Sequence, residues 1–140
     1  MAETIHVDIV SAEGEIFSGP AKLVFLPAAE GEIGVAPRHA PLLTLLKAGE
    51  VRVQPVEGAE QSFYVGGGAL EVQPTKVTVL ADTALRAADL DEAAAMAARQ
   101  RAEEALAGKI DRIEQAEALA ELARAAAQLK LIQRLRKIRG

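Results

Sequence analysis

The sequence predicts an α+β protein, with an N-terminal antiparallel β-sandwich followed by a C-terminal antiparallel two-helix hairpin. Two observations carry this prediction. All six prolines and nine of the eleven glycines precede residue 85, and eighteen alanines lie between residues 84 and 127. Proline and glycine mark turns, whereas alanine is the strongest helix former. We therefore expect two domains, residues 1–86 and residues 87–140.

Apolar and polar residues alternate at several places in the first half of the chain. The period of two is clearest in residues 5–9, 51–53, 70–72 and 77–79. Such alternation places the apolar side chains on one face of a strand. Turn-forming pairs such as Glu13-Gly14 separate the runs. Short strands at this spacing predict an antiparallel sandwich or a flattened barrel.

The run Gly66-Gly67-Gly68 has two interpretations. A glycine-rich loop can cradle a phosphate, but only where a helix follows it. Here the run lies between two strand-like segments, residues 63–65 and 69–72. We therefore expect a bulge or a tight corner of the sheet, because glycine inside a strand is typical of both.

The helical half begins at a recognisable capping signal. Asp89 is followed three residues later by Glu92, which is the spacing of a capping box. The first helix is expected over residues 90–107. Gly108 is expected in the left-handed conformation that ends many helices. The second helix is expected over residues 111–136.

Each helix carries apolar positions at spacings of three and four, which predict the contact between the two helices. These positions are Leu90, Ala94, Ala97, Ala98, Ala105 and Leu106 in the first helix, and Leu119, Leu122, Ala126, Leu129, Ile132 (or Gln133) and Leu135 in the second. Alanine buries little surface, so an alanine seam stabilises less than a leucine seam. The hairpin is therefore expected to separate easily, and a plain two-helix cap on the sheet is the alternative.

The charges are distributed unevenly along the chain. The net charge of −4 argues against general nucleic-acid binding, which needs a basic surface. Residues 124–140 nevertheless contain six basic residues and no acidic one. These are Arg124, Lys130, Arg134, Arg136, Lys137 and Arg139. They indicate an acidic partner, although cations at a helix C-terminus also complement the helix dipole.

Nothing in the sequence assembles a catalytic or metal-binding set. There is no cysteine, and the two histidines, His6 and His39, are far apart. Glu30 and Glu32 flank Gly31, which indicates either an acid–base pair or, more simply, a solvated loop. His39 lies in the stiff segment 37–41, where a packed or interface histidine is expected. No secretory signal or membrane span is expected, so a cytoplasm-facing binding or regulatory module is predicted.

Several long stretches resemble one protein family. Residues 11–19, 30–44 and 67–84, together with residues 89–93, are similar to the epsilon subunit of bacterial F-type ATP synthase, which is called delta in mitochondria. The resemblance implies a non-catalytic subunit of the central rotor stalk. It implies binding to the gamma subunit and the ring of c subunits, with proton-driven ATP synthesis carried out by the complex. The location implied is peripheral, at the cytoplasmic face of the bacterial inner membrane.

The resemblance also implies site residues. Glu30, Glu32 and His39 correspond to the part of the family that faces the c-ring. In the family the hairpin can extend into the catalytic head of alpha and beta subunits and inhibit ATP hydrolysis. Its basic residues then meet an acidic segment of the beta subunit. The residues implied for that contact are Arg124, Lys130, Arg134, Arg136 and Lys137.

Some relatives bind ATP between the two helices, and this chain matches their motif only in part. Asp91, Arg101 and Arg124 match, but Ala94 and Gln128 stand where basic residues are expected. Lost phosphate contacts each cost roughly 1.5–3 kcal/mol, so we expect no cofactor and at most weak ATP binding. Two rival hypotheses remain: a free-standing nucleotide sensor, and an adaptor whose basic helix binds another acidic protein.

Overall fold

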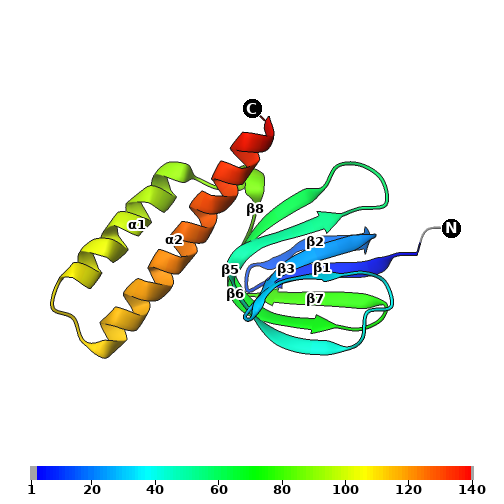
Figure 1. Ribbon diagram of the computed structural model, residues 1–140, viewed down its shortest axis with the longest axis horizontal. Helices are drawn as coiled ribbons and strands as arrows, with labels where there is room; N and C mark the ends of the chain where they lie inside the picture. The colour runs from blue at the N-terminus through cyan, green and yellow to red at the C-terminus, as the bar shows by residue number, and fades with distance from the viewer. Residues whose placement is uncertain (1–2, 140) are drawn as a thin grey trace. The chain divides into compact units, whose positions relative to one another are not determined.

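The computed structural model describes residues 3–139, with side chains for residues 3–138, and the chain divides into two compact units after Ala87 (Figure 1). The first unit is built of strands and the second of two helices, so the predicted α+β combination is confirmed. Within the described residues, neither helix has the length and hydrophobicity that a membrane span requires.

In its described residues, the first unit has eight strands joined into one bent sheet. They are β1 (Ile5–Ser11), β2 (Gly14–Ala21), β3 (Leu23–Ala28), β4 (Gly31–Val35), β5 (Leu42–Gln54), β6 (Gln61–Val72), β7 (Lys76–Ala81) and β8 (Ala84–Arg86). The strand order is β2-β1-β7-β6-β5-β3-β4, and β8 pairs with β6. The ladders are antiparallel except the one between β1 and β7, which is parallel. The first strand of the unit is thus bonded to one made some seventy residues later.

The predicted alternation places one set of side chains in the core. In β1, for example, Ile5, Val7 and Ile9 are fully buried, whereas His6 between them is exposed. The same pattern recurs in the strands around it. The other fully buried residues of the sandwich include Val24, Leu26, Val35, Val51, Val53, Val65, Leu70, Val72, Val77 and Val79.

The glycine run forms a corner of the sheet and not a bulge. Gly67 and Gly68 have φ values of +111° and +141°, which L side chains rarely adopt. The register between β5 and β6 is the same on both sides of the run, so no residue is inserted. Figure 1 shows both long strands curving at one end of the sandwich. Of the two structures expected here, the tight corner is confirmed.

The second unit comprises a short 3-10 turn, η1 (Ala87–Asp89), and the helices α1 (Glu92–Ala107) and α2 (Arg112–Arg139). Helix α1 begins two residues later than predicted, because Asp89 belongs to the turn and Asp91 is the N-cap. The Asp91 carboxylate accepts a hydrogen bond from the Ala94 N–H at 3.1 Å. Asp111 caps α2 in the same way, at 2.8 Å from the Glu114 nitrogen.

The end of α1 differs from the prediction. Gly108 has φ −91° and ψ −179°, so it is extended and not left-handed. Its N–H donates to the Ala105 carbonyl oxygen at 3.3 Å, which closes the last turn. Glycine therefore ends this helix by leaving it in an extended conformation. Helix α2 continues three residues beyond the predicted end.

The two helices pack through a narrow seam of small residues. The buried positions at heptad-like spacing are Ala95, Ala102, Ala118, Ala125 and Leu129. The predicted stripe was wrong by one position in places, since Ala94 is exposed and Leu119 is 49% exposed. Four of these five residues are alanines, so the seam buries little apolar surface per residue.

Candidate interaction surfaces

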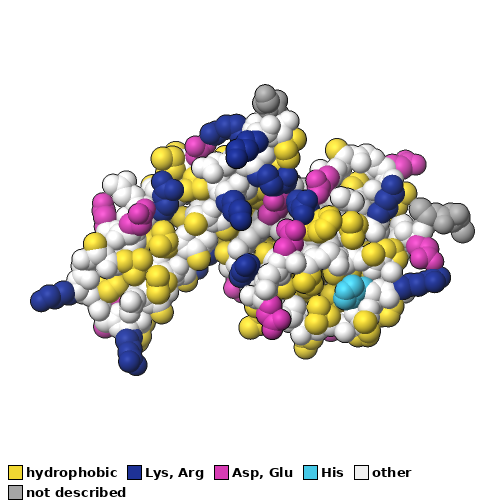
Figure 2. Space-filling view, in the orientation of Figure 1, with side chains coloured by type: hydrophobic (Ala, Val, Ile, Leu, Met, Phe, Trp, Pro, Cys, Tyr) yellow, Lys and Arg dark blue, Asp and Glu magenta, His cyan; other side chains and the backbone are white. Residues whose placement is uncertain are grey.

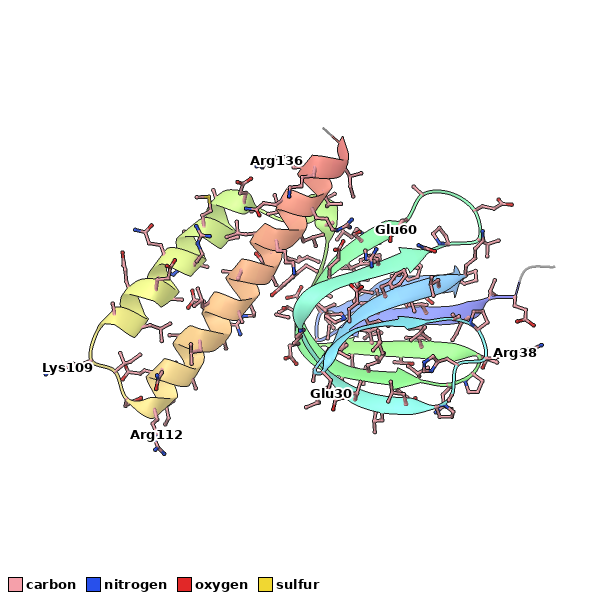
Figure 3. The ribbon with its side chains drawn as sticks, in the orientation of Figure 1. Glu30, Arg38, Glu60, Lys109, Arg112 and Arg136 are labelled. Atoms are coloured by element: carbon pink, nitrogen blue, oxygen red, sulfur yellow. The ribbon has the colours of Figure 1, made fainter. Side chains whose placement is uncertain are left out.

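The structure separates the three residues that the resemblance assigns to the c-ring. Glu30 lies in the turn between β3 and β4, Glu32 lies in β4, and His39 lies in the loop after β4. Figure 3 shows Glu30 and Arg38, the neighbour of His39, at opposite ends of the sandwich. The five residues of β4 span about 15 Å. The set thus forms two groups, one at each end.

Glu32 is held in place by an arginine. The Arg52 guanidinium lies 3.2 Å from Glu32 and 3.6 Å from Glu60, and it stacks 4.3 Å from the centre of the Phe25 ring. Arg52 is only 24% exposed, whereas Glu32 is 57% exposed. The carboxylate is therefore anchored on one side and open to solvent on the other. Such a group is ordered before a partner arrives, which lowers the entropic cost of docking.

The His39 loop is fixed by its backbone. Arg38 has a φ of +68°, which is uncommon for a residue other than glycine, and its N–H donates to the Pro74 carbonyl at 2.8 Å. The His39 Nδ1 lies 2.7 Å from the Ala40 carbonyl oxygen. Because a carbonyl only accepts, Nδ1 carries the proton, and in the neutral ring Nε2 is left as an acceptor. The loop thus presents His39 Nε2 as a hydrogen-bond acceptor in a fixed orientation.

An apolar surface that sequence reasoning missed crosses three strands, β5, β6 and β7. Leu43 is 75% exposed, Leu45 67% and Leu80 55%. In the sheet Leu45 pairs with Ala69, which pairs with Leu80, so these residues are neighbours. We call Leu43, Leu45, Ala69 and Leu80 the leucine face. Clustered exposed leucines of this kind mark interaction surfaces.

A polar cluster continues the same sheet beyond β7, where Asp8 of β1 pairs with Thr78. The Asp8 carboxylate accepts a hydrogen bond from the Ser18 hydroxyl at 2.6 Å, and it lies 2.8 Å from His6 Nε2 and 3.1 Å from Lys76 Nζ. The Ser18 hydrogen bond, followed by those from Lys76 and His6, lowers the pKa of Asp8 to about 2. Among the described residues, no group of His, Asp and Glu is arranged to hold a metal ion.

The cations of α2 lie on different sides of the helix. Figure 2 shows Lys and Arg side chains gathered over the C-terminal part of α2. Lys130, Arg134 and Lys137 are four and three residues apart and therefore share one side, which we call the basic face. Arg136 lies roughly a third of a turn away, on the side of the seam. The Arg139 side chain lies outside those described.

Ion pairs between described side chains join the two helices. Arg136 pairs with Glu92 in the first turn of α1, and Arg101 lies 3.2 Å from Glu121. By contrast, Arg124, Lys130 and Lys137 are exposed. Within the described part of the chain they form no ion pair. Among the cations implied by the resemblance, Arg136 is thus occupied within the hairpin, whereas Arg124, Lys130 and Lys137 are open to solvent.

The structure does not bring together the residues that partly match the ATP motif. Asp91 is engaged as the N-cap of α1, and it lies about 15 Å along the helix from Arg101. The guanidinium of Arg101 is occupied by Glu121. Arg124 is exposed. The three side chains thus do not converge on one site in this hairpin.

Two family models together match nearly the whole chain. Residues 4–87 match the β-sandwich domain of the ATP synthase delta/epsilon chain. Residues 88–133 match the long α-helix domain of the same chain. The two matches meet where the structure passes from strands to helices.

Curated proteins with high sequence identity carry one name. The ATP synthase epsilon chain of Nitrosococcus oceani is 65% identical over 140 residues, which covers 100% of both chains. The ATP synthase epsilon chain of Alkalilimnicola ehrlichii is 62% identical and covers 96% of both chains.

Solved structures share the fold at low sequence identity. A chain of the Euglena gracilis mitochondrial ATP synthase, in an assembly of OSCP, F1 and c-ring, has a TM-score of 0.71 and 18% identity, over 98% of this chain and 82% of that one. A chain of the Tetrahymena thermophila mitochondrial ATP synthase, from the central stalk and c-ring, has a TM-score of 0.66 and 12% identity, over 93% and 97%. Both comparisons support the same arrangement of strands and helices.

Proposed function

Because the chain belongs to the ATP synthase delta/epsilon family and is a non-catalytic epsilon subunit of the F-type enzyme, we propose a coupling role for it. In this proposal it couples the gamma subunit to the c-ring and restrains ATP hydrolysis. The chemistry of ATP synthesis from ADP and phosphate belongs to the catalytic head of alpha and beta subunits. The complex is proposed to be proton-driven. This chain is proposed to sit peripherally at the cytoplasmic face of the bacterial inner membrane, held there by its partners.

The leucine face is the observation that carries the docking part of this proposal. Leu43, Leu45 and Leu80 are all more than half exposed in the isolated chain. Covering such a surface releases about 25 cal/mol for each Å² of apolar area removed from water. A rotor subunit must stay bound while torque passes through it, and a broad apolar contact meets that need. We therefore assign this face to the gamma subunit.

The two ends of β4 are proposed as separate contact points on the c-ring. Glu30 and Glu32 lie at one end and His39 at the other. A ring of identical subunits repeats the same polar loop around its rim, so two points about 15 Å apart can meet two copies of that loop. The anchored carboxylate of Glu32 and the oriented His39 Nε2 offer hydrogen-bond acceptors to such loops.

The basic face of α2 supports the proposed inhibitory role. Lys130, Arg134 and Lys137 line one side of the helix over about two turns. Because the seam between the helices consists mostly of alanines, separating α2 from α1 costs little free energy. An extended α2 would present these cations, together with Arg124, to an acidic segment of the beta subunit. ATP is not proposed as a strong ligand, because its candidate residues do not converge.

The proposal is tested on a catalytic head depleted of this subunit. The full chain should bind the head and inhibit ATP hydrolysis. The double substitution Lys130→Glu and Lys137→Glu should leave the sandwich intact and remove most of the inhibition, because it reverses two charges of the basic face.

The matched control is Lys109→Glu, which reverses an exposed cation at the far end of the hairpin (Figure 3). It should inhibit like the wild-type chain. If the wild-type chain binds without inhibiting, the subunit is a coupling element only. If it does not bind at all, the assignment of its partners is wrong.

A further inference from the structure

Arg136 pairs with a carboxylate on the facing helix, whereas Lys130 and Lys137 of the same helix form no ion pair among the described residues. The carboxylate belongs to Glu92, which is 44 residues earlier in the chain. Glu92 is the first residue of α1 and follows the N-cap Asp91. The guanidinium therefore already contacts an acidic first turn of an antiparallel helix.

The position of Arg136 around the helix explains this pairing. Counting 3.6 residues per turn, Arg136 falls on the same side of α2 as the seam residues Ala125 and Leu129. The basic face lies roughly a third of a turn away. The side chain of Arg136 is 66% exposed, so Glu92 occupies it by charge pairing and not by burying it, and a partner must compete with that carboxylate.

We infer that Glu92 is an internal competitor for Arg136, which an acidic segment of a partner must replace when the hairpin opens. This inference rests on the proposed inhibitory function and adds the residue pair that controls it. Glu92 begins α1 and is close in sequence to the exposed Asp91 and Asp89, so this segment carries the negative charge expected of the partner's segment. The contact keeps the hairpin closed and withholds one cation from the partner.

The two halves of the ion pair are predicted to have opposite effects on inhibition. Glu92→Gln releases Arg136, so the concentration of the chain that gives half-maximal inhibition should fall about two- to fivefold, as expected for an exposed ion pair. Arg136→Gln breaks the same ion pair but also removes the cation that the partner would bind. It should therefore raise that concentration. Both are measured on the catalytic head depleted of this subunit.

The second ion pair between the helices provides the matched control. Arg101→Gln and Glu121→Gln each break the pair between Arg101 and Glu121. If breaking an ion pair merely loosens the hairpin, these two variants should shift the concentration for half-maximal inhibition in the same direction. If Glu92→Gln and Arg136→Gln also shift that concentration in the same direction, the competition is refuted while the inhibitory function stands. If the wild-type chain does not inhibit, the proposed function fails and the inference fails with it.

A distance measurement on the isolated chain checks the contact without any partner. The chain has no cysteine, so spin labels are placed by Ala93→Cys and Ile138→Cys, both at exposed positions. The distribution of distances between the labels should broaden equally in Glu92→Gln and Arg136→Gln. An unchanged distribution in both would show that the ion pair does not hold the helices, and would overturn the inference.

Discussion

Gly68 approaches the backbone of Leu80 so closely that a β carbon on Gly68 would lie 2.1 Å from the Leu80 carbonyl oxygen. Gly68 belongs to β6, and Leu80 belongs to the adjacent strand β7. The same glycine has a φ of +141°. Steric space and backbone conformation thus both require glycine at the corner of the sheet.

Gly68→Ala is therefore expected to destabilise the sandwich by about 3–5 kcal/mol, since it adds a clash to a conformation that alanine rarely adopts. Urea unfolding followed by circular dichroism measures the change. Gly58→Ala is the control, because Gly58 has a φ of +93° with no atom within 4 Å of its added β carbon. It should cost about 1 kcal/mol. Equal costs at both positions would show that the close approach contributes nothing.

Asp8 should make the stability of the sandwich depend on acid. Because the folded pKa is lowered to about 2 from 3.8, the ionised carboxylate stabilises the fold above about pH 4, and this contribution is lost as the pH falls toward 2. Asp8→Asn should cost about 1–2 kcal/mol at neutral pH through weakened hydrogen bonds. The difference in the free energy of unfolding between the wild-type chain and Asp8→Asn, measured by urea unfolding, should shrink below pH 4. A difference that is constant with pH would contradict this assignment.

Leu43→Asp should weaken binding to the gamma subunit by roughly 10- to 100-fold, because it replaces an apolar contact with a charge that must be desolvated. Leu43 is 75% exposed, so unfolding stability should change by only about 0.5 kcal/mol. Isothermal titration calorimetry with the gamma subunit gives the affinity. Glu57→Gln, an exposed change in the loop between β5 and β6, serves as the control and should bind normally. Unchanged binding of Leu43→Asp would remove the leucine face from the interface.

ATP should leave the melting temperature of the isolated chain unchanged to within about 1 °C at a few millimolar nucleotide. A ligand in hundredfold excess over its Kd stabilises by about 2.7 kcal/mol, which shifts melting by several degrees. The expectation follows from Ala94, which has no charge to offer phosphate, and from Arg101, which Glu121 occupies. Differential scanning calorimetry with and without ATP measures this shift. A rise of several degrees in the melting temperature would restore the hypothesis that the hairpin is a nucleotide sensor.

Sequence patterns predicted the class of the fold and, as one of two alternatives, the corner at Gly66–Gly68, because alternation and glycine have direct backbone consequences. They did not predict the register of the helical seam. Alanine occupies nearly every face of α1, so the pattern could not distinguish Ala94 from Ala95. The cap was misplaced for a similar reason: Asp89 and Asp91 both precede helical sequence, and only Asp91 accepts the hydrogen bond from Ala94.

The candidate surfaces were less predictable still. Leu43 and Leu45 are leucines in a β-strand, and nothing local distinguishes them from core residues. The left-handed backbone of Arg38 depends on a hydrogen bond to Pro74 from a distant loop. The pairing of Arg136 with Glu92 depends on the alignment of two whole helices. Each of these features comes from tertiary contacts, which a period of two or 3.6 does not encode.

The parallel ladder between β1 and β7 has a consequence for biosynthesis. On the ribosome, β1 emerges long before β7. The parallel ladder, in which Ile9 pairs with Val79, can therefore form only after β7 has been synthesised. The nascent sandwich therefore carries an unpaired strand edge and a partly exposed core through most of its synthesis. The helical hairpin, whose contacts are local, has no such delay and should form rapidly once its second helix is released. Chaperone dependence in this chain is accordingly expected to concentrate in the segment made first.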